Sequence, residues 1–188
     1  MVLEGERVKL VPLTSNFFDD LLQVGRAKEI WAHISIDGSD SDTLLRELKS
    51  AVIRRSTGEQ YPFVIIDKLH NKVIGSTRFY NIYPAHRKLE IGWTWYDPAY
   101  WGTTYNPECK LLLLEYCFET LKTVRVQFQT SEHNMRSRKA IQKIGGVYEG
   151  ILRNERILPD GSIRNTAMFS IIQDEWPEVK QRLKNRIK

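Results

Sequence analysis

The sequence predicts a single domain of the mixed α+β class. Three apolar segments rich in β-branched and aromatic residues follow one another between short loops, at 61–67, 73–81 and 89–96, as in an antiparallel meander. The segments before and after these strands include stretches with the apolar spacing of helices. Neither an internal repeat nor a flexible linker interrupts the chain. A chain of 188 residues can bury a substantial core. We therefore expect the whole of 1–188 to fold as one domain.

The remaining elements follow from apolar periodicity and from capping residues. Before the meander, residues 6–13 alternate as a strand, a helix ends near Gly25, and Asp42 caps a second helix that ends at Gly58. The segment 29–34 is short and ambiguous. After the meander we expect a helix at 106–121 capped by Asn106, a strand at 124–129, a helix at 134–144, strands at 146–156 and 163–172 joined by a turn at 158–161, and a helix at 174–187.

The composition is that of a soluble protein, with 41% hydrophobic and 27% charged residues. No apolar run approaches the ~18 residues that suggest a membrane span, and the N-terminus lacks the basic-then-apolar layout of a signal peptide. Cys109 and Cys117 lie on one predicted helix, too far apart along its axis for a disulfide. We therefore expect a cytoplasmic protein with reduced cysteines and no membrane partner.

The net charge of +5 is concentrated at the end of the chain, where five Lys and Arg residues stand between 180 and 188. A basic surface can hold nucleic acid, a polyphosphate cofactor or an anionic partner. No RNA- or DNA-binding motif of the known kinds is present, so we expect a solvated helix face and no direct nucleic-acid partner. A ribosome-associated or nucleic-acid-binding protein is the alternative. The histidines show no ligand spacing with the cysteines, and no metal is expected.

The segment from Glu90 to Glu108 carries the most chemical information. It is predicted to be a strand with one carboxylate, a turn-rich loop and the start of an apolar helix. Such a junction points several backbone N–H groups at one spot, which is a common way to hold a phosphate. Further along, Ser131-Glu-His-Asn-Met-Arg-Ser137 opens a second amphipathic helix that ends at Gly145-Gly146.

The two segments together resemble the acetyl-CoA site of the GNAT superfamily of N-acetyltransferases. The closest resemblance is to the RimL-like branch, which contains the ribosomal-protein N-terminal acetyltransferases, and it covers nearly the whole chain. It implies a twisted mixed sheet that splays open between its fourth and fifth strands, here 89–96 and 124–129. Acetyl-CoA would enter this wedge, and its pantetheine arm would pair with the backbone of Thr94, Trp95 and Tyr96.

The resemblance also assigns the pyrophosphate loop. The family pattern Gln/Arg-x-x-Gly-x-Gly/Ala falls on Trp101-Gly102-Thr103-Thr104-Tyr105-Asn106, and Trp-Gly at its start agrees with the RimL-like branch. Thr104 and Asn106 stand where the family has small residues. A glycine lets the backbone approach the phosphates and adopt a positive φ, which a β-branched Thr104 disfavours. An ordinary loop into a capped helix is the alternative interpretation.

The second family pattern, Asn-x-x-Ser/Ala-x7-Gly, is met by Asn134, Ser137 and Gly145. In the family this Asn touches the cofactor arm. Many members place a tyrosine general acid where Ile141 stands here, and members without it have a serine, corresponding to Ser137, as the candidate acid. Water is another proton source, because a thiol with a pKa of ~8.5 needs little help to leave. Alternatively, Asn134 only caps the helix and Ser137 is a core hydroxyl.

Glu90 is the candidate general base. By this resemblance, Glu90 corresponds to the glutamate on strand four that several GNAT enzymes use as a base, often through water. Strand alternation puts Glu90 on one face with Thr94 and Tyr96. A buried carboxylate is costly unless it is paired or functional, so a salt bridge with Arg78 or Arg87 is the structural alternative. The attacking amine must be neutral, and a backbone N–H of this strand would stabilise the developing oxyanion.

The sequence therefore predicts an enzyme that transfers the acetyl group of acetyl-CoA to a primary amine. The RimL-like resemblance favours a protein N-terminal α-amine as the acceptor. A small-molecule amine, such as an amino acid or an aminoglycoside, is the enzymatic alternative, and a GNAT module that binds CoA without catalysis is the other. Residues 31–36 and the turn at 158–161 are expected to face the acceptor. A helical stripe of Arg136, Lys139 and Lys143 either steers CoA phosphates or is solvated. The protein is expected to be a monomer or a homodimer.

Overall fold

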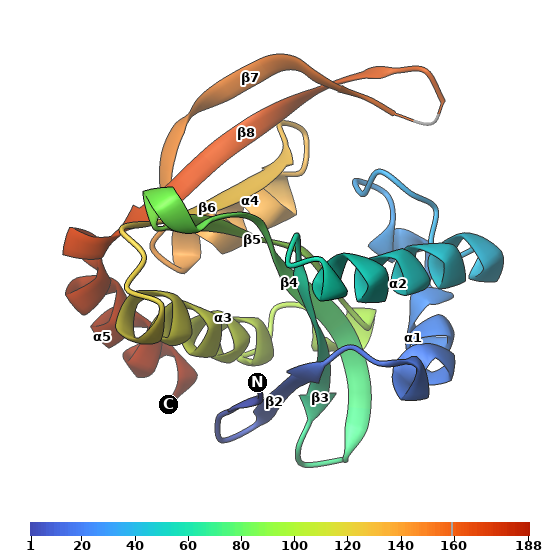
Figure 1. Ribbon diagram of the computed structural model, residues 1–188, viewed down its shortest axis with the longest axis horizontal. Coiled ribbons are helices and arrows are strands. Elements are labelled where there is room, and N and C mark those ends of the chain that lie inside the picture. Colours follow the sequence, from blue (N-terminus) through green and yellow to red (C-terminus); the bar gives the residue numbers. More distant parts are fainter. Residues whose placement is uncertain (159) are drawn as a thin grey trace.

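The protein folds around one eight-stranded sheet with helices on both faces (Figure 1). The computed structural model describes residues 1–158 and 160–188. Across the sheet the order is β1-β2-β3-β4-β5-β6-β8-β7, and every neighbouring pair is antiparallel except β5 and β6. The mixed α+β class that the sequence predicts is confirmed. The strands are β1 (Leu3–Glu4), β2 (Val8–Pro12), β3 (Tyr61–Asp67), β4 (Lys72–Tyr83), β5 (Lys88–Tyr96), β6 (Arg125–Ser131), β7 (Val147–Ile157) and β8 (Ile163–Ile172).

Two groups of helices cover the two faces of the sheet. In Figure 1, α3 and α5 lie on one side of the sheet, and α1 and α2 lie on the other. Each side buries its own apolar cluster, with Phe63, Ile91 and Leu113 on the α3 side and Leu44, Val64 and Trp95 on the α2 side. The helices are α1 (Phe18–Gly25), α2 (Ser41–Ser56), α3 (Tyr105–Glu115), α4 (Met135–Lys143) and α5 (Trp176–Ile187), and a π-helical turn at Tyr116–Thr120 continues α3.

Two expected helix caps are wrong. Helix α2 is capped by Asp40, whose side chain accepts a hydrogen bond from the Thr43 backbone N–H at 2.8 Å, and the expected cap, Asp42, lies inside the first turn. Helix α3 begins at Tyr105 with Thr104 as its N-cap and no side-chain capping bond. Asn106, the expected cap, lies within α3. In both helices several polar residues stand near the start, and the sequence pattern does not distinguish the cap from a polar residue in the first turn.

Strands β5 and β6 pair only at one end. Their parallel ladder joins Lys88 to Arg125, Leu89 to Val126 and Glu90 to Gln127, and it stops there. These are the two strands between which the resemblance to the GNAT superfamily predicts a splay. The remainder of β5, up to Tyr96, therefore has a free edge on the β6 side.

A β-bulge interrupts β5 between Gly92 and Trp95, a short way beyond Glu90. Pairing with β4 shifts between the Arg78–Gly92 pair and the Ser76–Trp95 pair, because β5 has one residue more than β4 in this interval. The bulge contains Trp93, which adopts the left-handed conformation with φ at +49°. A left-handed non-glycine residue in a strand is unusual and is found most often beside functional sites.

The bulge reverses which residues of β5 share a face. Tyr96 packs in the apolar cluster on the α3 side, and Thr94 bonds to Lys110 of α3. Trp95 packs on the α2 side. The expectation that Glu90 shares a face with Thr94 and Tyr96 is therefore wrong. Simple alternation holds up to Gly92, and the extra residue then inverts it.

The cysteines lie in the core on the α3 side. Cys109 in α3 and Cys117 in the π-helical turn are both buried and free, as the sequence predicts. In the part of the chain that the structure describes, no helix has the length and apolar character needed to cross a membrane.

Candidate active site

A cleft opens where β5 and β6 separate. Its walls come from the segment before α2, from β5 and the loop after it, from α3, β6 and α4, and from the β7–β8 hairpin. Among the described residues, no Asp or Glu lines the cleft, and its charged lining residues are all cationic: Lys110, Arg136, Arg156 and Arg164. The cleft is therefore suited to anionic ligands.

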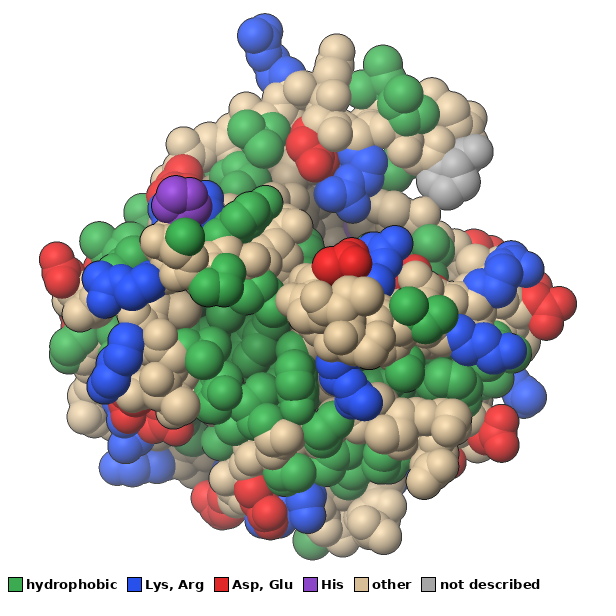
Figure 2. Space-filling model, viewed as in Figure 1, with side chains coloured by type: hydrophobic (Ala, Val, Ile, Leu, Met, Phe, Trp, Pro, Cys, Tyr) green, Lys and Arg blue, Asp and Glu red, His purple; other side chains and the backbone are tan. Residues whose placement is uncertain are grey.

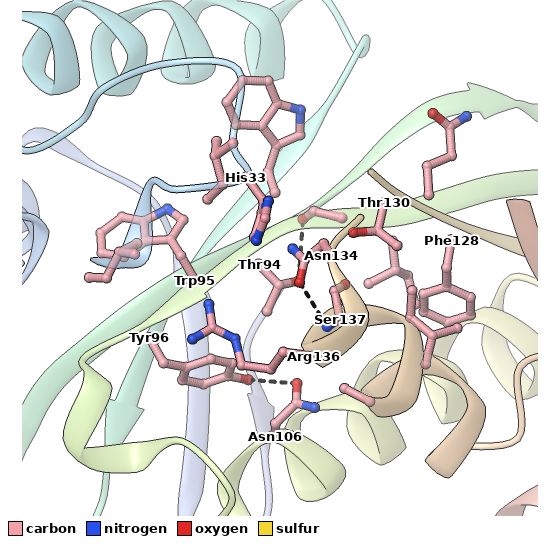
Figure 3. Close-up of a pocket in the computed structure, with 18 of the residues that line it drawn as sticks. His33, Thr94, Trp95, Tyr96, Asn106, Phe128, Thr130, Asn134, Arg136 and Ser137 are labelled. Atoms are coloured by element: carbon pink, nitrogen blue, oxygen red, sulfur yellow. Dashed lines mark hydrogen bonds between the residues drawn. The ribbon is translucent and has the colours of Figure 1, made fainter. Parts of the chain in front are cut away.

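Most of the site residues expected from the sequence line this cleft. Those that line the cleft are Thr94, Trp95, Tyr96, Trp101, Gly102, Asn106, Asn134 and Ser137. The other expected residues, Glu90, Thr103, Thr104 and Tyr105, do not line it. Figure 3 shows Asn134, Arg136 and Ser137 of α4 facing Thr94 and Tyr96 across the cleft, with His33 above.

The loop between β5 and α3 is shaped by its backbone. Gly102 has φ at +77°, and nothing lies within 4 Å of where a Cβ would stand, so its requirement is conformational. Thr104 has φ at −77°, in the right-handed helical region. Its β-branched side chain therefore causes no strain, which removes the conflict that the family pattern raised. This loop leads directly into the N-terminus of α3, the positive end of the helix dipole.

Asp67, at the end of β3, holds this loop in place. Its carboxylate accepts hydrogen bonds from the hydroxyls of Tyr100 at 2.9 Å and Tyr105 at 2.8 Å, and it contacts His70 Nδ1 at 2.6 Å. Burial of the Asp67 carboxyl opposes ionisation, but the hydrogen bonds from His70, Tyr105 and Tyr100 outweigh it and lower its pKa to about 2. Asp67 was not predicted as a site residue, although a carboxylate that ends an apolar strand was a usable signal.

Helix α4 contributes one capping residue and one cation. Asn134 Oδ1 accepts from the Ser137 backbone N–H at 3.0 Å, so Asn134 does cap α4, and it also lines the cleft (Figure 3). The Arg136 guanidinium lies 3.6 Å from the centre of the Trp101 ring, which joins α4 to the loop before α3. Lys139 and Lys143 are exposed and do not line the cleft, so the predicted basic stripe divides into one site residue and two solvated ones.

Glu90 is fully buried, with 0% of its surface exposed, and it has three neutral hydrogen-bond donors. They are the Tyr80 hydroxyl, Asn81 Nδ2 at 3.1 Å and Gln129 Nε2 at 3.0 Å. Asn81 has φ at +46° and lies in a bulge of β4, so bulges in both strands flank the carboxylate. The structural alternative, a salt bridge with Arg78 or Arg87, is absent from the described residues, and Arg78 pairs with Glu47 at 2.8 Å instead.

Burial raises the pKa of Glu90, because the ionised form is poorly solvated. Burial and the neighbouring Glu90 carboxylate raise the pKa of Tyr80 well above its usual value of 10. Tyr80 and Gln129 line the cleft, and Glu90 lies behind them. The Tyr80 hydroxyl, which donates a hydrogen bond to Glu90, therefore connects this carboxylate with the cleft. Tyr80 was not predicted as a site residue, because only the strand register shows that it stands directly opposite Glu90.

Lys110 is the third site residue, after Asp67 and Tyr80, that the sequence pattern did not reveal. It is 5% exposed, and its Nζ donates to Thr94 Oγ1 at 2.7 Å. Among the described residues, no carboxylate lies within salt-bridge distance of it, and burial lowers its pKa to about 8. A lysine inside the apolar run of α3 was the available signal. An unpaired buried cation in a cleft is a binding group for negative charge.

Comparison with known proteins agrees with this fold. Residues 7–147 match the family described as the acetyltransferase (GNAT) domain. The N-acetyltransferase p20 of Bacillus licheniformis is 26% identical over 177 residues, which cover 93% of this chain and 97% of that protein. A crystal structure assigned as an acetyltransferase from T. thermophilus is 32% identical, with a TM-score of 0.88, and the match covers 100% of this chain and 97% of that one.

A more distant structure shares the fold. Mycobacterium smegmatis RimJ in complex with CoA-disulfide is 19% identical, with a TM-score of 0.83, over 99% of this chain and 95% of that one. The strands, the cleft and these matches define a class, the acyl-transferring enzymes of mixed α and β structure. The chain belongs to the GNAT acetyltransferase family. It is an acetyltransferase, and enzymes of this family use acetyl-CoA.

Proposed function

We propose that the protein transfers the acetyl group of acetyl-CoA to a primary amine, and that the acceptor is a protein N-terminal α-amine. The observation that carries the proposal is the cationic cleft between β5 and β6, with a loop–helix junction on one side and, on the other, Tyr80 hydrogen-bonded to the buried Glu90. RimJ of M. smegmatis, which has the same fold, is the neighbour whose structure contains CoA-disulfide.

The residues present suit acetyl-CoA, which supplies the acetyl group as a thioester. The free edge of β5 at Thr94, Trp95 and Tyr96 offers backbone groups to the amides of the pantetheine arm. The loop from Trp101 to Asn106 and the N-terminus of α3 offer backbone N–H groups to the pyrophosphate. Arg136 and Asn134 close this side from α4.

Glu90 serves as the base through Tyr80. The Tyr80 hydroxyl takes a proton from the incoming amine while it gives its own proton to Glu90. The high pKa of Tyr80 excludes a standing phenolate, so the hydroxyl only relays the proton. The raised pKa of Glu90 makes its carboxylate a stronger base than an exposed one. A β5 backbone N–H near the Trp93 bulge stabilises the negative charge that develops on the acetyl oxygen.

Two groups can return a proton to the leaving thiolate. The Ser137 hydroxyl lines the cleft beside Ile141, which has no proton to give. Lys110, with a pKa of about 8, is the second group, since this value lies close to the pKa of ~8.5 of a free thiol. Both are neighbours of the proposed pantetheine path.

The proposal is tested by titrating the protein with acetyl-CoA and then measuring release of free CoA with peptides of different N-termini. We expect acetyl-CoA at 100 times Kd to stabilise the fold by ~2.7 kcal/mol. We also expect free CoA from peptides with an open α-amine and none from the same peptides blocked at the N-terminus. Absence of binding would overturn the cofactor assignment. Transfer to lysine side chains alone would overturn the acceptor assignment.

A further inference from the structure

Two arginines of the β7–β8 hairpin lie directly opposite each other at the edge of the cleft. Arg156 of β7 pairs in register with Arg164 of β8, and both side chains line the cleft. Like charges in directly opposed strand positions destabilise a sheet. In Figure 2 the surface is hollowed beneath this hairpin, and both Lys or Arg and Asp or Glu side chains stand at the border of the hollow.

A single carboxylate serves both arginines. Glu155 lies 3.3 Å from Arg156 Nη2 and 4.0 Å from Arg164 Nη2, and it is the only ion-pair partner of either within residues 1–158 and 160–188. The Glu155 carboxylate also accepts a hydrogen bond from Thr166 at 2.9 Å. Arg164 is 11% exposed in its side chain, so its charge is poorly solvated. One positive charge is therefore left uncompensated in a partly buried place.

The arginine pair lies close enough to Tyr80 and Glu90 for their charges to interact. The charge of Arg156 reaches Glu90 and acts to lower the pKa of that carboxyl, against the larger effect of burial. Arg156 Nη1 also donates to Ser35 Oγ at 3.4 Å, in the segment expected to face the acceptor. A ligand whose amine lies at Tyr80 therefore shares the cleft with both guanidinium groups.

Resting on the proposed function, we infer that the acceptor carries a carboxylate close to its primary amine, and that Arg156 and Arg164 bind this carboxylate. Guanidinium groups match the planar geometry of a carboxylate and bind it with two parallel hydrogen bonds. Within the proposed acceptor class, a polypeptide whose first residue is Asp or Glu has this arrangement. A free α-amino acid has it too, and its use would keep the arginine site but replace the protein acceptor. Because no described Asp or Glu lines the cleft, polycationic amines find no counter-charge there.

The test compares acceptors that differ only in the carboxylate. Free amino acids are measured against their amides, and peptides that begin with Asp against peptides that begin with Asn, by kcat/KM for release of CoA. Arg156→Gln and Arg164→Gln are the variants, and Arg153→Gln, at an exposed position of the same hairpin, is the matched control. The first pair of acceptors tests the amino-acid source, and the second tests the peptide source.

We expect each cleft variant to lose about 10- to 100-fold in kcat/KM for the carboxylate member of the accepted pair. The neutral member should change by less than about threefold, the control should lose nothing, and acetyl-CoA affinity should persist in all three. Equal use of both members by the unaltered protein would overturn the inference. Equal losses for both members in the variants would also overturn it. Arg156, which is more exposed than Arg164, provides a test even where Arg164→Gln fails to fold.

A binding measurement separates this inference from the proposed function. Fluorescence of the cleft tryptophans is titrated with N-acetylglycine, N-acetylglycinamide and N-acetyl-Asp-amide. If no amine is acetylated, the proposed function fails, yet tighter binding of the two carboxylate ligands, lost in Arg156→Gln, still supports the arginine site. If the carboxylate and amide ligands bind equally, the arginine site is wrong whatever the turnover.

Discussion

The two ends of the cleft are built in different ways. The proposed cofactor end consists of two continuous stretches, 94–110 and 134–144, and relies largely on backbone features such as the free edge of β5, the positive φ of Gly102 and the ends of α3 and α4. The acceptor end is assembled from side chains that are far apart in the sequence, with Tyr80, Glu90 and Arg164 on three different strands. A general cofactor is held by local motifs, and the particular acceptor by residues that only the fold brings together.

The comparison predicts that changes at the acceptor end alter turnover and leave acetyl-CoA affinity intact. The largest effect is expected for Glu90→Gln, which removes the proton acceptor and preserves the shape. Its amide can face Tyr80, whose hydroxyl then accepts. We expect kcat to fall by ~10²–10⁴-fold at neutral pH, with a smaller loss at high pH, where the amine deprotonates unaided.

The pH profile of the unaltered enzyme tests the same group independently. Because burial raises the pKa of Glu90 above the usual 4.5, activity should fall as the pH drops through that raised value, since the carboxyl becomes protonated. This lower limb should be missing in Glu90→Gln. Full activity in a folded Glu90→Gln protein would remove Glu90 from the mechanism.

At the cofactor end, Lys110→Met should stabilise the protein and weaken its affinity for acetyl-CoA. The pKa of Lys110 is lowered from 10.5 to about 8, so the charged form costs folding free energy below pH 8. At pH 7 the Met variant should have a free energy of unfolding higher by up to about 3 kcal/mol. This difference should disappear as the pH rises from 8 to 10.5. Urea unfolding at a series of pH values measures it. A constant difference across that range would show that Lys110 does not titrate there.

Gly102→Val should weaken acetyl-CoA binding by about tenfold, because a left-handed conformation costs a β-branched residue roughly 1–2 kcal/mol. Thr104→Gly is the matched control and should bring no gain in affinity, since Thr104 already has a right-handed φ. Calorimetric titration of both variants measures this. Normal affinity in folded Gly102→Val would mean that the loop does not hold the phosphates.

The smallest effect is expected for Tyr100→Phe and Tyr105→Phe, each of which removes one hydrogen bond to Asp67. Each should raise the Kd for acetyl-CoA by a few-fold, since the loop loses one hydrogen bond that stabilises its conformation by about 0.5–1.5 kcal/mol. Turnover at saturating acetyl-CoA should not change. A drop in kcat without a change in Kd would instead connect this loop with the acceptor end.

The sequence was informative where a structural rule acts over short range. Strands 61–67 and 163–172 were predicted with their observed bounds because apolar alternation or β-branched composition is a local property. The helix caps were less predictable, since Asp40 and Asp42 are equally good residues for that position. Tyr80 could not be found without knowing the register of β4 and β5.

The Trp93 bulge makes the length of β5 part of the chemistry. Removing one residue between Glu90 and Thr94 would restore strict alternation and exchange the two walls of the strand. Thr94 and Tyr96 would then face the side of α2, and Lys110 would lose its hydrogen-bond acceptor. A deletion that leaves Glu90, Thr94 and Tyr96 in the chain would thus turn the Thr94 hydroxyl away from Lys110, because the order of residues along a strand matters here as much as their identity.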